Sequence, residues 1–203
     1  MSARRRKLRG LIFVISGPSG SGKTTLRDNL FKDRELRKRL VKSVSLTTRK
    51  KRSGERSGRD YFFITKGEFS RRLKQKKILE WTRYLGYYYA TPRDFVEKQL
   101  KAGKNIALCL DLKGVVYINR LYPKNSVSIF ILPPSLLALR KRIEGRCSKT
   151  KKEEVGMRLK LAKKELRACA RHDYSLVNRN LTKAARELKS IILKELNNQT
   201  NAR

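Results

Sequence analysis

The chain has 203 residues, and 39% of them are hydrophobic, so it can build one domain with a core of its own, or one core that carries small insertions. Its 52 Lys and Arg against 17 Asp and Glu leave a formal net charge of +35, which attracts polyanions such as nucleic acid, an anionic membrane surface or anionic substrates. The apolar run at 11–16 is far too short to span a membrane. The three cysteines include no CxxC pair, which argues against a disulfide framework or a zinc site. We therefore expect a cytoplasmic protein without membrane insertion.

The first half of the chain opens with LIFVIS at 11–16, a continuous apolar run that predicts a buried strand of a parallel sheet. Leucines at roughly helical intervals predict a helix from Lys23 to about Leu40. Further extended segments are expected at 42–46 and 60–64, a short helix around Phe69 and Leu73, and two strands joined by a turn at Gly86 within 78–90.

The second half alternates strands and helices. Thr91 as N-cap and Pro92 at the first helical position predict a helix that runs to about Ala102, where Gly103 ends it. Buried strands are expected at 105–111, 127–133 and 175–178, and helices at 135–144, about 152–170 and 181–196. This alternation predicts an α/β fold with a mostly parallel sheet, interrupted by a mainly β insertion at 42–90.

The stretch GPSGSGKT at 17–24 fits the phosphate-loop pattern G-x-x-x-x-G-K-[ST] between a predicted strand and a predicted helix. Its backbone N–H groups and the helix N-terminus favour phosphate, Lys23 is placed for the β and γ phosphates, and Thr24 for Mg²⁺. The residues expected to bind the ATP phosphates are Gly17, Ser19, Gly20, Ser21, Gly22, Lys23, Thr24 and Thr25. The motif predicts a nucleoside triphosphate site but not the reaction.

A second site is indicated by charged residues in and after the insertion. Arg49 and Arg52, with Tyr61 following, can clamp a monophosphate through charge-assisted hydrogen bonds. Glu80 suits guanine, whose N1–H and amino group form a donor pair on one edge that adenine lacks. Asp111, at the end of a predicted strand, is either a site carboxylate or only a helix N-cap.

Six segments carry a resemblance to the guanylate kinases: SGPSGSGKTTL, SVSLTTRKKRSGERSGRDYFF, ILEWTRYLGYYYATP, LDLKG, FILPPSLLALRKRIEGR and HDYSLVN. The resemblance covers residues 10–196, and its second segment is the most specific. It implies a three-layer P-loop kinase core with a mostly parallel sheet, a β-rich GMP-binding insertion and a small helical lid. The implied division is a basic arm at 1–9, a core at 10–41, 93–136 and 160–199, the insertion at 42–92, the lid at 137–159 and a tail at 200–203.

The resemblance also implies the activity, which is ATP-dependent phosphorylation of GMP, and of dGMP, with Mg²⁺. Its implied acceptor-site residues read the guanine and hold the GMP phosphate: Ser45, Glu80, Thr91 and Asp111 for the base, and Arg49, Arg52, Tyr61 and Tyr89 for the phosphate. Its implied catalytic residues neutralise the transferring group: Lys23, Arg142, Arg146 and Arg158. Asn178 matches a position near the adenine of ATP.

Four positions depart from the family pattern, and one of them is Arg179, which replaces an acidic residue after Asn178. Cys109 stands where the family often has the first Asp of an Asp-x-Asp pair, while Ala90 and Cys147 each replace a common Gly. Two alternatives stay open: a guanylate-kinase-like interaction module without catalysis, and a module that binds nucleic acid nonspecifically through its charge. The oligomeric state is not predicted.

Overall fold

The structure is a computed structural model that describes residues 10–145 and 152–201. Its core is a parallel sheet with the strand order β2-β7-β1-β8-β9. The strands are β1 (Ile12–Ser16), β2 (Leu40–Lys42), β7 (Asn105–Cys109), β8 (Ser126–Leu132) and β9 (Tyr174–Val177). All five residues of β1 are buried, as expected for a central strand that is covered on both faces.

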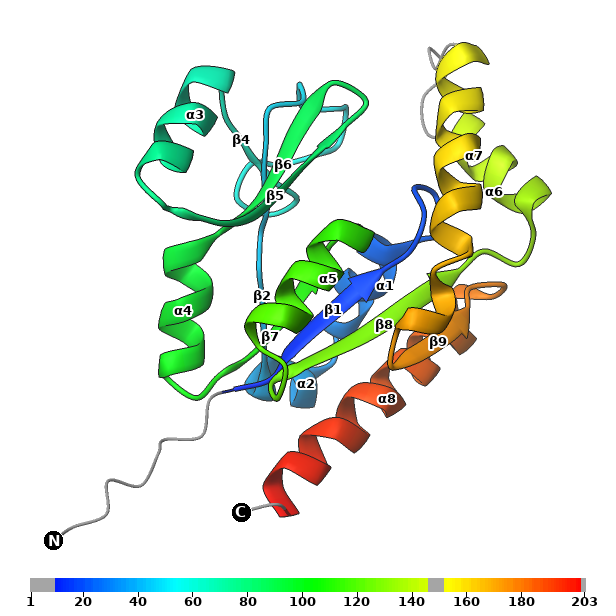
Figure 1. Cartoon of the computed structure of the whole chain (residues 1–203). Helices are drawn as coiled ribbons and strands as arrows, with labels where there is room; N and C mark the ends of the chain where they lie inside the picture. The colour runs from blue at the N-terminus through cyan, green and yellow to red at the C-terminus, as the bar shows by residue number, and fades with distance from the viewer. Residues whose placement is uncertain (1–9, 146–151, 202–203) are drawn as a thin grey trace, which may run out of the picture.

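Helices cover both faces of this sheet. Successive side chains of β1 point to opposite sides, and since all of them are buried, both faces need a covering layer. Phe13 and Ile15 pack in one apolar cluster, and Ile12 and Val14 in another. The first cluster includes residues of α1 (Lys23–Leu30), α2 (Arg34–Arg39) and α8 (Leu181–Asn201), and the second residues of α4 (Arg93–Lys101) and α5 (Leu112–Leu121). The expected three-layer α/β architecture is confirmed (Figure 1).

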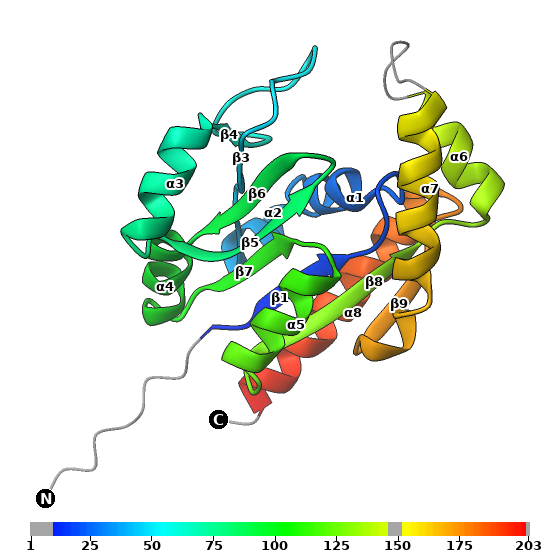
Figure 2. The same ribbon diagram turned by 45° about the horizontal axis from the view of Figure 1, so that its top comes forward.

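A second, smaller sheet has the order β4-β3-β6-β5. It comprises β3 (Leu46–Thr47), β4 (Phe62–Phe63), β5 (Ile78–Tyr84) and β6 (Tyr87–Pro92), with α3 (Lys66–Lys74) beside it. The turn between β5 and β6 has positive φ at both Leu85 and Gly86, the conformation of a tight hairpin turn, so the predicted two strands with a turn are confirmed. On the other side of the phosphate loop, α6 (Leu136–Glu144) and α7 (Lys152–Leu166) pack against each other (Figures 1 and 2).

Two of the predicted helix boundaries are wrong for local reasons. The expected helix from Lys23 to Leu40 is two helices, because Asp33 accepts hydrogen bonds from two backbone N–H groups and starts α2, and Leu40 already begins β2. Thr91 does not cap α4. It lies in β6, where its hydroxyl donates a hydrogen bond to Glu80, and the N-cap residue is Pro92.

Other differences concern the ends of elements. The strand expected at 105–111 ends at Cys109, since Asp111 is the N-cap of α5, a helix that the sequence patterns did not predict. The segment expected at 42–46 is divided between β2 and β3. The helix expected at 152–170 ends at Leu166, and the one expected at 181–196 continues to Asn201. In the described part of the chain, no helix combines the length and apolar character needed to cross a bilayer.

Candidate active site

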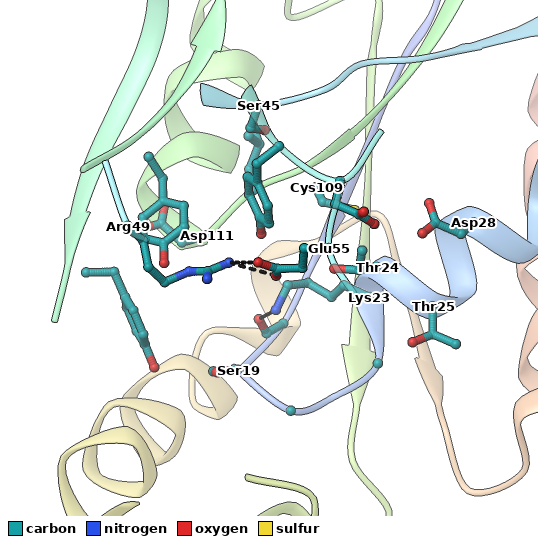
Figure 3. Close-up of a pocket in the computed structure, with 18 of the residues that line it drawn as sticks. Ser19, Lys23, Thr24, Thr25, Asp28, Ser45, Arg49, Glu55, Cys109 and Asp111 are labelled. Atoms are coloured by element: carbon teal, nitrogen blue, oxygen red, sulfur yellow. Dashed lines mark hydrogen bonds and ion pairs between the residues drawn. The ribbon is translucent and has the colours of Figure 1, made fainter. Parts of the chain in front are cut away.

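A cavity of about 590 Å³ opens between the phosphate loop, the small sheet and α7. It lies beyond the carboxyl ends of β1 and β7, where ligands bind in parallel α/β sheets. Most of the predicted site residues line it: Gly17, Ser19, Gly20, Gly22, Lys23, Thr24, Thr25, Ser45, Arg49, Arg52, Tyr61, Glu80, Tyr89, Asp111 and Arg158. Figure 3 shows Lys23, Arg49 and Asp111 among the residues of this wall. Ser21, Thr91, Arg142 and Asn178 lie behind its wall, and Arg146 lies outside the described residues.

The phosphate loop takes its shape from glycines at two crowded positions. Gly17 has φ +133°, and a Cβ there would lie 2.4 Å from the carbonyl oxygen of Ile131. Gly22 has φ +97°, and a Cβ there would lie 2.3 Å from the side-chain nitrogen of Asn178. Only glycine meets both requirements, because it tolerates positive φ and has no Cβ. At the end of the loop, the Lys23 ammonium donates hydrogen bonds to the carbonyl oxygens of Gly17 and Pro18.

Arg142 and Asn178 support the loop from behind. The side-chain amide of Asn178 donates a 2.8 Å hydrogen bond from Nδ2 to the backbone carbonyl oxygen of Ser21. The backbone carbonyl oxygen of Asn178 accepts a hydrogen bond of 2.8 Å from Arg142 Nη2. The chain of contacts therefore runs from α6 through the end of β9 to the phosphate loop. The other terminal nitrogen of Arg142, Nη1, is buried and has no hydrogen-bond partner among the described residues.

Arg158 reaches the phosphate loop from α7. Its Nη1 donates a 2.9 Å hydrogen bond to the Ser19 hydroxyl, and its Nε and Nη2 donate to Oε1 of Glu154 one helical turn earlier. Only 8% of Arg158 is exposed. Glu154 thus holds the guanidinium in place over the loop, in a setting where its charge is poorly screened by water.

Glu55, another residue of the cavity wall, joins the two predicted phosphate-binding arginines. Arg49 Nη2 donates to both carboxylate oxygens of Glu55, at 2.8 and 3.0 Å (Figure 3). The Arg52 backbone N–H donates to Glu55 Oε2 at 2.8 Å. Burial alone would favour the protonated acid, but these hydrogen bonds lower the pKa of Glu55. Glu55 was not predicted as a site residue, although it lies in the most specific of the segments that carry the family resemblance.

Tyr61 and Tyr89 stand beside this pair of arginines. Their rings meet edge to face with centroids 5.9 Å apart, and the Arg49 guanidinium lies 5.6 Å from the centre of the Tyr61 ring. Burial raises the pKa of Tyr61, so its hydroxyl remains protonated and can donate a hydrogen bond. The four side chains predicted to hold a phosphate therefore all line the same cavity.

Glu80 is a buried carboxylate with one short hydrogen bond. The Thr91 hydroxyl donates to its Oε1 at 2.5 Å, and a Cβ on Gly114 of α5 would come within 3.1 Å of its Oε2. Burial raises the pKa of Glu80 to about 7, and the charge of Asp111 adds to this rise. Asp111 itself accepts a hydrogen bond from the Gly114 N–H, so it is both the N-cap of α5 and a residue of the cavity wall.

Ser45 completes the predicted base-reading residues. It is half-buried in the short link between β2 and β3 and lines the same cavity as Glu80. Ser45 and Glu80 therefore present a hydroxyl and a carboxylate that can accept hydrogen bonds from the edge of a nucleotide base.

Cys109 occupies the cavity wall near Arg27 and Asp28, which the sequence reasoning did not single out. Arg27 is buried and donates from Nε to Asp28 Oδ1 at 3.1 Å, and Lys42 pairs with the same oxygen at 2.8 Å. Burial raises the pKa of the Cys109 thiol, so it stays neutral. Asp28, not Cys109, therefore supplies the negative charge on this side of the cavity.

Glu165 of α7 is a further carboxyl group in the cavity wall that the sequence did not indicate. Burial raises its pKa to about 7, and the nearby Lys23 opposes this rise. No motif marks Glu165, because its position follows only from how α7 packs over the phosphate loop.

A phosphate loop on a parallel α/β core, with a guanidinium-rich pocket opposite it, defines the class of P-loop nucleotide-binding proteins. Residues 9–195 match the sequence profile described as guanylate kinase, and the chain belongs to the guanylate kinase family.

Individual relatives agree with this assignment. The chain is 40% identical to a guanylate kinase of Bacillus cereus over 190 residues, which cover 94% of this chain and 91% of the relative. It is 41% identical to one of Listeria innocua over 184 residues, which cover 91% and 88%. The crystal structure of a guanylate kinase from Anaplasma phagocytophilum superposes with a TM-score of 0.77 at 33% identity, covering 92% of this chain and 86% of that one.

Proposed function

We propose that this protein catalyses ATP + GMP ⇌ ADP + GDP in the cavity described above. The observation that carries the proposal is the pairing of two sites in one cavity: a phosphate loop with Lys23 and Thr24, and a second set made of Glu80, Arg49 and Arg52. The family assignment supports the same reaction. An interaction module without catalysis has no need of either set of residues.

Glu80 and Ser45 are proposed to read the guanine edge. An ionised Glu80 accepts from N1–H and from the exocyclic amino group, while Thr91 holds the carboxylate in position and Asp111 adds negative potential. Adenine offers no such donor pair, so AMP would leave the buried carboxylate unpaired.

The GMP phosphate is proposed to lie between Arg49, Arg52, Tyr61 and Tyr89. Glu55 already holds the Arg49 guanidinium and the Arg52 backbone, so the Arg49 side chain is positioned before the phosphate arrives. This reduces the entropy lost when the acceptor binds.

The phosphoryl transfer itself requires no side-chain base, because the GMP phosphate is already an anionic nucleophile. The protein supplies in-line positioning and neutralisation of the negative charge in the transition state. Lys23 and Arg158 line the cavity where this charge develops, Arg142 supports the loop from behind, and Arg146 joins them by family resemblance. The adenine contact of Asn178 stays a prediction.

Mg²⁺ fits the residues present. The described residues contain no cluster of three His, Cys, Asp or Glu that holds a metal, which agrees with an ion bound by one hydroxyl, the ATP phosphates and water. Thr24 supplies the hydroxyl at the start of α1, and Asp28 is a nearby carboxylate in the same wall. The ion, when bound with ATP, neutralises phosphate charge.

We further propose that the insertion (42–92) and the lid (137–159) close over the two nucleotides as separate parts of the chain and exclude water. dGMP is included as an acceptor, and the cytoplasm is proposed as the compartment. Nonspecific nucleic-acid binding is a separate proposal that rests only on the charge of +35. It predicts retention of RNA or DNA at about 0.15 M salt and a steep loss of affinity as salt rises.

The deciding experiment is a coupled assay with the purified chain, ATP, Mg²⁺ and one monophosphate at a time. GMP is expected to release ADP, and AMP, UMP and CMP to be poor acceptors. Absence of turnover with GMP would contradict the proposed reaction, and equal turnover with AMP would contradict the role of Glu80.

A further inference from the structure

One aromatic residue of the cavity wall is used by none of the roles above. Tyr84 is the last residue of β5, two residues before the turn glycine Gly86. On a strand, residues two apart point to the same face, and Glu80, Thr82 and Tyr84 all line the cavity. At about 3.3 Å per residue, Tyr84 lies about 13 Å along the strand from Glu80, toward the phosphate loop.

Tyr84 meets the lid arginine at that end. The Arg158 guanidinium carbon lies 5.8 Å from the centre of the Tyr84 ring, within the range of a cation–π contact. The same guanidinium donates to Ser19 of the phosphate loop. A residue of the small sheet, a residue of α7 and a residue of the loop are therefore in one contact group.

The Tyr84 hydroxyl is buried near the Ser19 hydroxyl and has no hydrogen bond of good geometry to a described residue. Burial raises the pKa of the phenol, opposed by the neighbouring Ser19 and Arg158, so it is a protonated donor near neutral pH. A buried hydroxyl without a partner is unfavourable, and the cavity that it lines is where the phosphate chain of two nucleotides would run. Phosphate oxygens are the acceptors that would satisfy it.

We propose that Tyr84 is a further catalytic residue, whose hydroxyl donates a hydrogen bond to an oxygen of the transferring phosphoryl group and whose ring keeps Arg158 over the phosphate loop. The inference rests on the proposed reaction. On this proposal the smaller sheet, which carries the GMP-binding residues, also supplies a hydrogen-bond donor to the phosphoryl group. The set of catalytic residues is then complete only when Tyr84 of the smaller sheet contacts Arg158 of α7.

The test compares Tyr84→Phe with the wild type and with Tyr87→Phe. Tyr87 pairs with Tyr84 across the same hairpin, is exposed and does not line the cavity, so it is a matched control. Tyr84→Phe is expected to lower kcat about 10-fold while each KM changes less than about threefold, because the bond is strongest to the charge of the transition state. Tyr84→Leu, which also removes the ring, is expected to lower kcat further.

A binding measurement separates this inference from the proposed reaction. An adenosine–guanosine pentaphosphate, which joins both nucleotides through one phosphate chain, is expected to bind Tyr84→Phe about 10-fold more weakly than the wild type by calorimetry. If the wild type binds this probe but does not turn over, the reaction fails and the binding of Tyr84→Phe still decides the inference. Kinetics and binding of Tyr84→Phe within twofold of the wild type would overturn it, as would a wild type that does not bind the probe.

Discussion

The Thr91 hydroxyl and the Glu80 carboxylate are joined by a 2.5 Å hydrogen bond in the wall of the nucleotide cavity. The bond links two antiparallel strands, since Glu80 of β5 pairs with Thr91 of β6. It favours the ionised acid, yet burial still raises the pKa of Glu80 to about 7. The carboxylate is therefore placed and ready for a ligand that brings hydrogen-bond donors, but it is costly to ionise without one.

Replacing Glu80 by Gln tests whether this carboxylate reads guanine. Gln keeps the shape but loses the charge and one acceptor, so kcat/KM for GMP is expected to fall about 10- to 100-fold, since a hydrogen bond to a charged group contributes about 1.5–3 kcal/mol. The KM for ATP is expected to stay the same. Glu97→Gln, which removes a carboxylate from a surface pair with Arg93, is the matched control and should leave both unchanged. Unaltered GMP kinetics in Glu80→Gln would contradict the base-reading role.

The raised pKa of Glu80 makes GMP affinity depend on pH. Guanine needs the ionised acid, so affinity is expected to rise from pH 6 to pH 8 and to level off above the pKa of about 7. The phosphate of GMP also titrates near pH 6, and Glu80→Gln isolates that contribution because it keeps the phosphate site. Calorimetric titrations of both proteins across this range measure the difference; parallel curves would be evidence against the assignment.

The two carboxyl groups with raised pKa values, Glu80 and Glu165, are expected to make the stability of the protein depend on pH. Glu80 and Glu165 have pKa values of about 7 in the folded protein against 4.5 as the ordinary value, so the folded state binds more protons between these limits. The free energy of unfolding is therefore expected to fall as the pH rises from about 4.5 to 7, with at most about 3 kcal/mol from Glu80. Glu80→Gln should flatten part of this slope in urea unfolding curves; an unchanged slope would mean that Glu80 ionises normally.

Glu55 is expected to act on the acceptor phosphate through Arg49. Glu55→Gln weakens the ion pair and the hydrogen bond to the Arg52 N–H, so we expect a several-fold rise in the KM for GMP with little change for ATP. Glu68→Gln is the control in the same insertion, because its pair with Arg72 lies on the surface of α3 and contributes about 0.5 kcal/mol or less. Equal effects of the two substitutions would show that Glu55 does not position the site.

Gly22→Ala is expected to abolish the phosphate loop's function without unfolding the core. Its φ of +97° is unfavourable for Ala, and the new Cβ would clash with the Asn178 side chain that supports the loop. ATP binding, measured by calorimetry, is expected to be lost. Gly156→Ala is the matched control: Gly156 is an exposed residue of α7 with nothing within 4 Å of a new Cβ, so Ala should stabilise the protein by about 0.5–1 kcal/mol.

Much of the fold was predictable because its signals are local. The apolar run of β1, the hairpin at Gly86 and the phosphate loop each depend on residues that are neighbours in the chain. The wrong helix boundaries also have local causes, because in each case one side-chain hydrogen bond overrides the pattern. A run of leucines indicated one helix, but Asp33 caps a second one, and Thr91 donates to Glu80 instead of capping α4.

The candidate site was predictable as a list of residues but not as a set of contacts. Arg49, Arg52, Glu80 and the loop residues line one cavity, as the motifs indicated. Arg142 contacts the Asn178 backbone carbonyl oxygen and is not among the residues that line the cavity, and its catalytic role stays a prediction. Glu165 and Tyr84 were missed because their places in the cavity wall follow only from how α7 and β5 pack around it. Glu55 was missed although it lies six residues from Arg49 in the same loop.

The sequence by itself determined the nucleotide loop, the alternation of strands and helices and the family, because backbone conformation and periodicity are properties of short segments. The tertiary structure alone decided which residues from distant segments contact each other. Arg158 meets Ser19 across 139 residues and Asn178 meets Ser21 across 157, and neither contact has a signal in its own segment. Such pairs form only where the packing of the core brings two elements together, and there burial sets the pKa of each carboxyl group and the strength of each hydrogen bond.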